Sequence, residues 1–380
     1  RNMADAPIPI KRAHAFRHHL MTMSLDIDSN PIFAGNMSHH LKAWSLHPEY
    51  SFDIPAQALV ELPHLKGMLD GEAVPSDYRE FWGPIAKGGT GSIGHLTIDQ
   101  ETVLRKGLSG VMEEIRQSPP TKPAENQYRE AMLISLQAVI DWAERYRQAA
   151  IQRTRDTSDV ELKACYSRIA QALTQVPAKP ARNLFEALQA LMLVHYAIHL
   201  EGHNLSVSPG RLDQVLLPYY EDNEEAEDLF CAFLLKIAAN AIWGSFSKTQ
   251  AITLGGSDRF GNDQSNSLTL LWLLACDRMR LPDPHIFVRW HRALAPAVKE
   301  LCFDMLSRGV SMPLLVGDEI TRQGLFNASI TPEDAANYVI VGCNELGIPG
   351  KMLYHSVNFV PLEQLLTILQ TPAKRANIED

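Results

Sequence analysis

A cysteine and a carboxylate stand two positions apart in residues 341–351, VGCNELGIPGK. Three glycines and a proline hold this stretch in an irregular path. A carboxylate beside a thiol disfavours the thiolate that a nucleophilic cysteine needs. Loss of a hydrogen atom from sulfur needs no thiolate, but it needs an S–H group that is held rigidly and shielded from water. Cys343 and Glu345 therefore suit a reaction in which the sulfur loses a hydrogen atom and the carboxylate moves protons.

A cysteine hydrolase is the main alternative for this pair. Cys343 would then need a histidine as its base, and His355 is available downstream. This alternative predicts alkylation of Cys343 at neutral pH in air. The other four cysteines are scattered along the chain and are expected to be small buried apolar residues in a reducing cytoplasm. They are Cys165, Cys231, Cys276 and Cys302.

Two further patterns resemble known sites. Residues 89–94 match G-x-G-x-x-G, but no convincing strand precedes them, so a loop is expected there rather than a dinucleotide site. His195, His199 and His203 recur along a predicted helix. A helix rises about 1.5 Å per residue, so the outer two would lie roughly 12 Å apart, too far to share one metal ion. A packed, hydrogen-bonded pair is expected, and no metal site is predicted.

The composition is that of a globular protein with a large core. The chain has 380 residues, of which 46% are hydrophobic and 21% charged, and its formal net charge is −9. This charge gives no support to binding of nucleic acids or anionic membranes, which select basic surfaces. No apolar run reaches the roughly 20 residues that span a bilayer, and no signal peptide is recognisable. A cytoplasmic protein is therefore expected.

The segments that would position these residues show two kinds of sequence pattern. Residues 126–246 show long amphipathic helical patterns separated by prolines. The helices expected there are Asn126–Thr154, Ala181–Leu200 and Ala226–Trp243. Farther along, short β-rich runs alternate with helical runs, which predicts a parallel sheet or barrel with right-handed crossovers. The strands expected are Gln250–Leu254, His285–Trp290, Met312–Val316 and Tyr338–Val341, and the helices are Ser265–Met279, Ala295–Ser307 and Pro332–Asn337.

Residues 1–125 are rich in histidine, proline and glycine and are expected to form a loop-rich wrapping or lid region. No flexible tract separates the segments, so 1–125, 126–246 and 247–380 are interpreted as parts of one domain. Cys343 follows the last predicted strand directly, at the C-terminal end of a strand, where the ligand sites of α/β folds gather.

Several motifs, spread in order along nearly the whole chain, resemble the glycyl radical enzymes and in particular their pyruvate formate-lyase-like eliminase and lyase branch. The cysteine loop carries Gly342-Cys343-x-Glu345 and Pro349-Gly350-Lys351, where pyruvate formate-lyase itself has two adjacent cysteines. The other matching stretches are QAITLGG (250–256) with GND (261–263), RLPDP (280–284), MP (312–313), and SPGRLDQ (208–214) with PYY (218–220).

The resemblance implies a ten-stranded α/β barrel with extensive outer helices and a central cysteine loop. It implies that Cys343 becomes a transient thiyl radical that takes hydrogen from a small organic substrate, with Glu345 as the acid/base. His95 and Ser206 correspond to substrate-contacting residues of diol dehydratases, and His355 is a further substrate-binding candidate. The barrel itself would bind no cofactor, because a separate activating enzyme with S-adenosylmethionine and a [4Fe-4S] cluster installs the glycyl radical. An anaerobic setting and a homodimer are also implied.

The chain departs from the family pattern at three places. The lyases carry an aspartate downstream of the cysteine, where Ser356 or Val357 stands here. The histidine expected before Ser206 is replaced by Leu205. No C-terminal glycyl radical motif follows Cys343 in the sequence, so the barrel is expected to be incomplete, the glycyl radical domain to be missing, and a complementing C-terminal chain to be a partner.

The sequence therefore predicts a glycyl radical lyase that cleaves a C–O, C–N, C–S or C–C bond after hydrogen abstraction by Cys343. Two alternatives stay open. The protein could be a radical decarboxylase or a carbon–carbon bond-forming member of the same family. It could also be a non-catalytic binding or scaffold remnant without a radical source.

Overall fold

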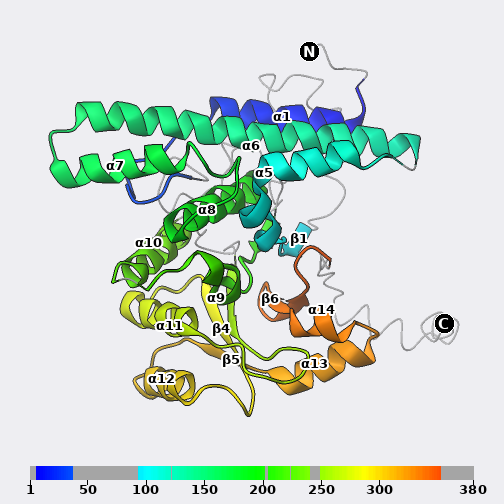
Figure 1. Ribbon diagram of the computed structural model, residues 1–380, viewed down its shortest axis with the longest axis vertical. Coiled ribbons are helices and arrows are strands. Elements are labelled where there is room, and N and C mark those ends of the chain that lie inside the picture. The colour runs from blue at the N-terminus through cyan, green and yellow to red at the C-terminus, as the bar shows by residue number, and fades with distance from the viewer. Residues whose placement is uncertain are drawn as a thin grey trace, which may run out of the picture.

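The computed structural model describes residues 6–36, 93–120, 122–201, 204–222, 224–239 and 249–351. In these residues a layer of helices lies above a layer of strands that has its own helices (Figure 1). The upper layer contains α1 (Ile8–Thr22), α5 (Gln100–Gln117), α6 (Pro123–Asp156), α7 (Val160–Ala172), α8 (Leu184–Glu201) and α10 (Ala226–Ala239). None of the helices in the described ranges combines the length and the apolar character needed to cross a membrane.

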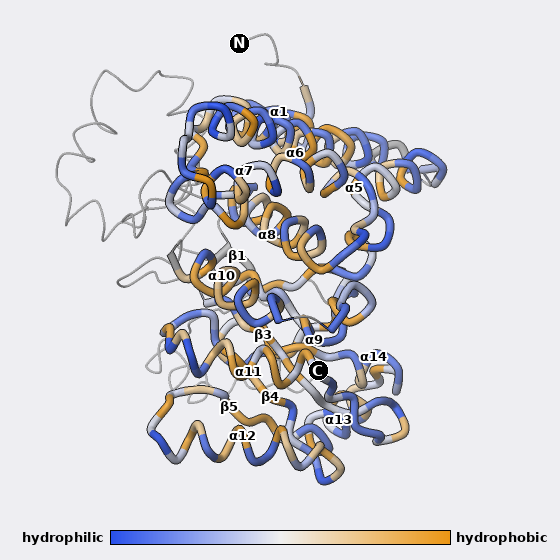
Figure 2. Tube along the Cα trace, turned by 60° about the vertical axis from the view of Figure 1, so that its left-hand side comes forward, coloured by the Kyte–Doolittle hydropathy of each residue, from blue (hydrophilic) through white to orange (hydrophobic). Residues whose placement is uncertain are grey.

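Helix α8 lies inside the upper layer because it has almost no polar face. It is buried along nearly its whole length, as a helix that is apolar on all sides must be. Helices α1 and α7 pack on α6 instead. Figure 2 shows many hydrophilic residues along α1 and α6 and mostly hydrophobic ones along α8.

Parallel strands form the centre of the lower layer. They are β1 (Ile93–Leu96), β2 (Asn204–Val207), β3 (Ala251–Gly255), β4 (His285–Trp290) and β5 (Leu314–Gly317). β1 pairs with β2, and β3, β4 and β5 pair in that order. Parallel bridges from Ser206 to Thr249 and from Gly210 to Ile252 join the two groups. The spatial order of these strands therefore follows their order in the chain.

Helices connect the strands, as parallel pairing requires. α9 (Leu212–Val215), the 3₁₀ turn η1 (Leu217–Tyr219) and α10 follow β2; α11 (Ser267–Met279) follows β3; α12 (Pro296–Ser307) follows β4; α13 (Asp318–Asn327) and α14 (Pro332–Ala336) follow β5. The ring of Phe230 on α10 stacks on that of Trp272 on α11, with centroids 4.1 Å apart. This contact joins the two layers through one hydrophobic core.

The chain then forms an antiparallel hairpin from β6 (Val339–Val341) and β7 (Glu345–Gly347). β6 lies against β3, next to α14 in Figure 1. The hairpin carries the residues that the sequence singles out for chemistry.

The predicted α/β architecture is confirmed. β4 has the predicted bounds, and α11, α12 and α14 begin and end within two residues of the prediction. The strand predicted from Met312 begins two residues later, at Leu314. The division of a single domain into three segments stays a prediction.

The loop-rich interpretation of residues 1–125 is wrong for α1 and α5. The buried residues of α1 recur every three or four positions, but histidines and arginines between them obscure the pattern. α5 is bent at Gly107, whose φ is 66°. Glycine is needed there, because a Cβ would lie 2.5 Å from the carbonyl oxygen of Ala178. Residues 37–92 lie outside the described ranges, so the wrapping or lid role of this region stays a prediction.

Candidate active site

The cysteine loop is the turn between β6 and β7. Gly342 has a φ of 60°, in the left-handed region that favours glycine, and it reverses the chain after β6. Cys343 follows and is exposed, so the described residues alone do not give its sulfur the shielding from water that loss of a hydrogen atom needs. The Glu345 carboxylate folds back over the turn, and its Oε2 accepts the backbone N–H groups of Cys343 at 2.9 Å and Asn344 at 3.2 Å. The side chain of Glu345 thus fixes the backbone that carries the cysteine.

His95 binds the other oxygen of the same carboxylate. Its Nδ1 lies 2.7 Å from Oε1 of Glu345, and the two side chains are 12% and 23% exposed. His95 lies in strand β1, where its side chain is mostly buried. The sequence separation of this pair is 250 residues, and the fold brings it together directly beside Cys343.

Gly342 leaves the space that this pair occupies. A Cβ on Gly342 would lie 2.3 Å from Nδ1 of His95 and 2.4 Å from Oε2 of Glu345. No side chain fits at either distance. Gly342 is therefore required both by its backbone angle and by the histidine–carboxylate contact.

The charge state of Glu345 follows from these contacts. Burial raises its pKa, but the backbone N–H groups of the loop and the His95 ring outweigh burial and hold the pKa below its ordinary value. Glu345 is therefore an ionised carboxylate near neutral pH. It can accept a proton, while His95 can shuttle one.

Ser206 lies beside His95 on the neighbouring strand, since the two residues are opposite each other in the β1–β2 register. It is fully buried, and its Oγ accepts the N–H of Gly342 at 2.9 Å. The structure thus brings together four of the predicted site residues: Cys343, Glu345, His95 and Ser206. The fifth, His355, lies outside the described residues.

The far end of the loop has two anchors that sequence spacing did not indicate. Gly350 packs against Asp99, where an added Cβ would approach the Asp99 Cβ to 3.0 Å. Lys351 Nζ forms an ion pair with Asp334 Oδ1 at 2.6 Å. The only signal in the sequence was the Pro-Gly-Lys motif itself.

The histidine pair of α8 has a structural role. His195 Nε2 lies 2.5 Å from Oε1 of Gln250, and the rings of His195 and His199 meet edge to face with centroids 4.8 Å apart. Gln250 also donates to the buried Asp283, whose pKa burial raises to about 7. The interpretation of a packed, hydrogen-bonded pair is confirmed, while His203 lies outside the described residues.

Three of the four remaining cysteines are buried, as predicted: Cys231, Cys276 and Cys302. The prediction is wrong for Cys165, which is partly exposed. Among the described cysteines, Cys343 is the one with an exposed side chain.

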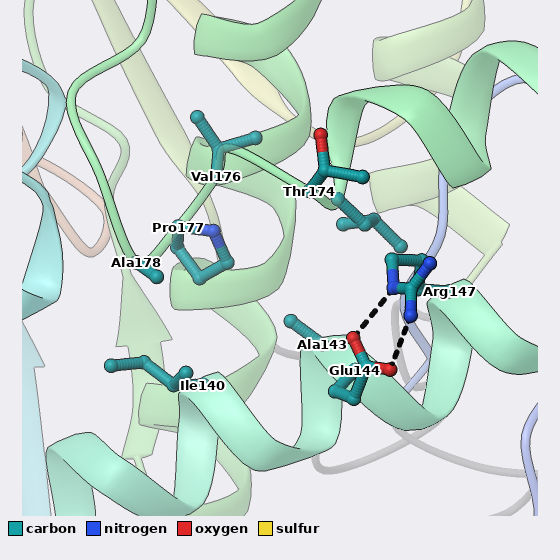
Figure 3. A pocket seen from close by; sticks show the side chains of 9 residues that line it. Ile140, Ala143, Glu144, Arg147, Thr174, Val176, Pro177 and Ala178 are labelled. Carbon is teal, nitrogen blue, oxygen red and sulfur yellow. Dashed lines mark hydrogen bonds and ion pairs between the residues drawn. The ribbon is translucent and has the colours of Figure 1, made fainter.

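A cavity of about 300 Å³ lies between α6 and the segment that follows α7 (Figure 3). Glu144 and Arg147 form its charged side, joined by hydrogen bonds of 2.6 and 2.7 Å from Arg147 Nε and Nη2. Its other lining residues are Ile140, Ala143, Leu173, Thr174, Val176, Pro177 and Ala178. None of these residues belongs to the cysteine loop or contacts it through the bonds above, so the cavity is separate from the candidate site.

The chain is similar to several known proteins. Residues 87–371 match the protein family described as Pyruvate formate lyase-like. The chain is 28% identical to the probable dehydratase YbiW of Escherichia coli (strain K12), covering 92% of this chain and 50% of that protein. It is 27% identical to the isethionate sulfite-lyase of Bilophila wadsworthia (strain 3_1_6), covering 68% of this chain and 34% of that protein.

Among solved structures, the fold matches a glycyl radical enzyme from Archaeoglobus fulgidus with a TM-score of 0.73. The identity is 24%, and the match covers 91% of this chain and 52% of that one. The chain thus spans about half the length, or less, of the proteins it matches here.

Proposed function

The chain belongs to the pyruvate formate lyase-like family, and we propose that it carries the cysteine loop of a glycyl radical lyase that acts on a small organic substrate. The predicted membership of the lyase branch of the glycyl radical enzymes is confirmed. The observation that best supports the proposed chemistry is the Glu345 carboxylate, which bonds to the backbone of Cys343 with one oxygen and to His95 with the other. A radical-forming sulfur and a proton-transfer pair then face the same substrate.

In the proposed reaction the sulfur of Cys343, as a thiyl radical, takes one hydrogen atom from a substrate C–H bond and becomes S–H. Glu345 accepts a proton from the hydroxyl group on the carbon that lost the hydrogen atom. His95 delivers a proton to the group that leaves from the adjacent carbon. The proton gained by Glu345 passes to His95 through their hydrogen bond, which replaces the proton that His95 delivered. Cys343 then returns its hydrogen atom to the product radical and regains the thiyl radical. No external oxidant or reductant is consumed.

The relatives suggest which bond breaks. A probable dehydratase and an isethionate sulfite-lyase share the family. We therefore propose that the enzyme eliminates water or a sulfur group, which breaks a C–O or a C–S bond. We favour this reaction over cleavage of a C–N or C–C bond, decarboxylation and carbon–carbon bond formation. A radical S-adenosylmethionine activating enzyme, a homodimer, an anaerobic setting and a cytoplasmic location are part of the same proposal. The glycyl radical would come from a C-terminal region or a complementing chain.

The test is the Cys343→Ser variant of the full protein that contains this chain, activated without oxygen. We expect turnover of 1,2-diols or 2-hydroxysulfonates by the wild type and none by the variant, because an O–H bond is too strong to replace S–H in this exchange. Cys165→Ser, on the remote helix α7, is the control and should keep full activity. Substantial activity of Cys343→Ser would contradict the proposal, and a wild type in which no radical can be installed would favour a binding or scaffold protein.

A further inference from the structure

Strand β6 leads directly into the cysteine loop, and β7 covers only one of its edges. In the hairpin Val339 lies opposite Gly347, and Val341 lies opposite Glu345. Successive residues of a strand direct their backbone polar groups to opposite edges. The N–H groups of Ile340 and Gly342 bind Thr253 and Ser206, so the even-numbered residues of 338–342 direct their N–H and C=O groups away from β7, toward the barrel strands.

Two hydroxyl groups bind this second edge. Thr253 Oγ1 accepts the N–H of Ile340 at 2.9 Å, and Ser206 Oγ accepts the N–H of Gly342 at 2.9 Å. Both hydroxyl side chains are fully buried, so water does not compete for these N–H groups. The backbone of β6 is thus held by side chains where a neighbouring strand would normally pair with it.

A buried arginine binds the same edge of the chain at the start of β6. Arg289 Nη1 donates to the carbonyl oxygens of Tyr338 at 3.2 Å and Ala336 at 2.9 Å. Its Nε donates to Asp318 Oδ1 at 2.7 Å, and the guanidinium lies over the Tyr338 ring. The arginine is completely buried, and its ion pair with Asp318 keeps it fixed.

The three side chains come from three successive strands: Ser206 from β2, Thr253 from β3 and Arg289 from β4. Ser206 lies level with Thr249, so Thr253 is four residues farther along β3. Thr253 in turn lies level with Phe287, so Arg289 is two residues farther along β4. β6 therefore crosses β4, β3 and β2 obliquely. Its first residues lie beside Arg289, and its last lie beside Ser206, where the cysteine loop contacts His95.

We propose that Arg289, Thr253 and Ser206 form a side-chain ladder that sets the position of Cys343 along the axis of β6. The three side chains of the strand, Val-Ile-Val, are aliphatic and buried, so they form no directional bonds along its axis. A shift by one residue would move the loop by about 3.3 Å and turn its side chains to the other face. The ladder supplies the directional bonds that prevent this. The three are positioning residues, and their effect on catalysis rests on the proposed function.

Thr253 allows the sharpest test of the ladder. Thr253→Val keeps the shape of the side chain and replaces only the hydroxyl group. We expect backbone hydrogen exchange in the peptide covering 338–345 of the full protein to become about tenfold faster, since the Ile340 N–H loses its acceptor. Thr253→Ser restores the hydroxyl and should restore slow exchange.

Ser208→Ala is the matched control. Ser208 is also fully buried, and its Oγ accepts a backbone N–H, that of Ala251 at 3.2 Å, but this N–H belongs to β3 and not to β6. Its removal should leave exchange in 338–345 unchanged. In the activated enzyme, Thr253→Val should lower kcat by about tenfold or more with little change in KM, because Cys343 shifts relative to the substrate C–H bond.

Unchanged exchange in Thr253→Val, or equally fast exchange in Ser208→Ala, would overturn the ladder. Faster exchange in 338–345 with an unchanged kcat would overturn its role in positioning Cys343. Hydrogen exchange is measured without any radical, so it reports on the ladder even if the protein proves not to be a radical lyase. Loss of activity in Cys343→Ser with unaltered exchange in Thr253→Val would leave the proposed function and remove the ladder.

Discussion

At the scale of single residues, Gly342 is the position on which the site geometry depends most directly. Gly342→Ala would place a methyl group within 2.4 Å of both His95 and Glu345 on a backbone of φ 60°. We expect a loss of about 2–4 kcal/mol in the free energy of unfolding and no turnover, because the clash adds to the strain of a left-handed alanine. Urea denaturation and the activity assay together measure both effects.

Gly309→Ala separates the two contributions. Gly309 has a φ of 76°, and an added Cβ there would meet nothing within 4 Å. This control should lose about 1–2 kcal/mol of stability from backbone strain alone and keep full activity. If both variants were equally stable and equally active, the close contact at Gly342 would have no consequence.

Glu345 adds a dependence of stability on pH. Its pKa is lower in the folded protein than in the unfolded chain, so its stabilising effect is complete above the unfolded pKa and is lost as the pH falls through the folded pKa. Glu345→Gln should lower the free energy of unfolding at neutral pH by about 1–3 kcal/mol, since it replaces a charged acceptor. The difference between wild type and variant should then shrink toward acidic pH in urea titrations. A difference that does not change with pH would contradict the assigned charge state.

The chemistry at this scale was partly visible in the sequence. Cys343 and Glu345 are neighbours in the chain, so their pairing could be predicted from spacing alone. His95 and Ser206 could be proposed only from a family resemblance, since no local pattern connects them with the cysteine loop. Thr253 and Arg289 could not be predicted as site residues, because they lie in apolar strands where a single polar residue gives no indication of its partner.

At the scale of elements, the connection from β1 to α5 links His95 to the cysteine loop. Asp99 begins α5: its Oδ1 accepts the N–H of Thr102 at 3.0 Å and its Oδ2 accepts the Thr102 hydroxyl at 2.6 Å. The same residue packs against Gly350. We expect Asp99→Ala to lose about 1 kcal/mol of stability and to speed hydrogen exchange in the peptide that contains Gly350.

The cap of α7 provides a control for this prediction. Asp159 accepts the N–H groups of Glu161 at 2.9 Å and Leu162 at 3.0 Å, in the same way but far from the loop in sequence and on another helix. Asp159→Ala should lose a similar amount of stability without any change near Gly350. An effect on the loop from both variants, or from neither, would show that Asp99 has no special connection with it.

The elements with a clear hydrophobic repeat in the sequence could be predicted, and those without one could not. β4 and its neighbouring helices were correctly bounded because apolar runs and helical repeats alternate cleanly there. β1 and β2 were missed because they are four residues long and contain glycine, histidine and asparagine, which carry little strand signal. These two strands hold His95 and Ser206, so the weakest local patterns were the ones that build the site.

At the scale of the whole molecule, β5 is the last strand of the parallel sheet in the described residues, and apolar side chains remain exposed around it. Leu314 and Leu315 point to opposite faces of this strand, yet they are 39% and 40% exposed. Ile320 on the adjacent α13 is 82% exposed. An uncovered sheet edge bordered by apolar residues favours association with another polypeptide. The family resemblance predicted the barrel, but only the structure shows where its apolar edge lies.

This edge predicts concentration-dependent association of the 380-residue chain when it is produced alone. Ile320→Lys should weaken that association by about tenfold in sedimentation velocity experiments, because a charge would have to be buried beside β5. Val160→Lys is the matched control, since Val160 is 80% exposed but lies on α7, in the helical layer at the opposite end of the molecule (Figure 1). It should leave the association unchanged. Equal weakening by both substitutions would mean that general surface charge governs the association, and the β5 edge would then not be its site.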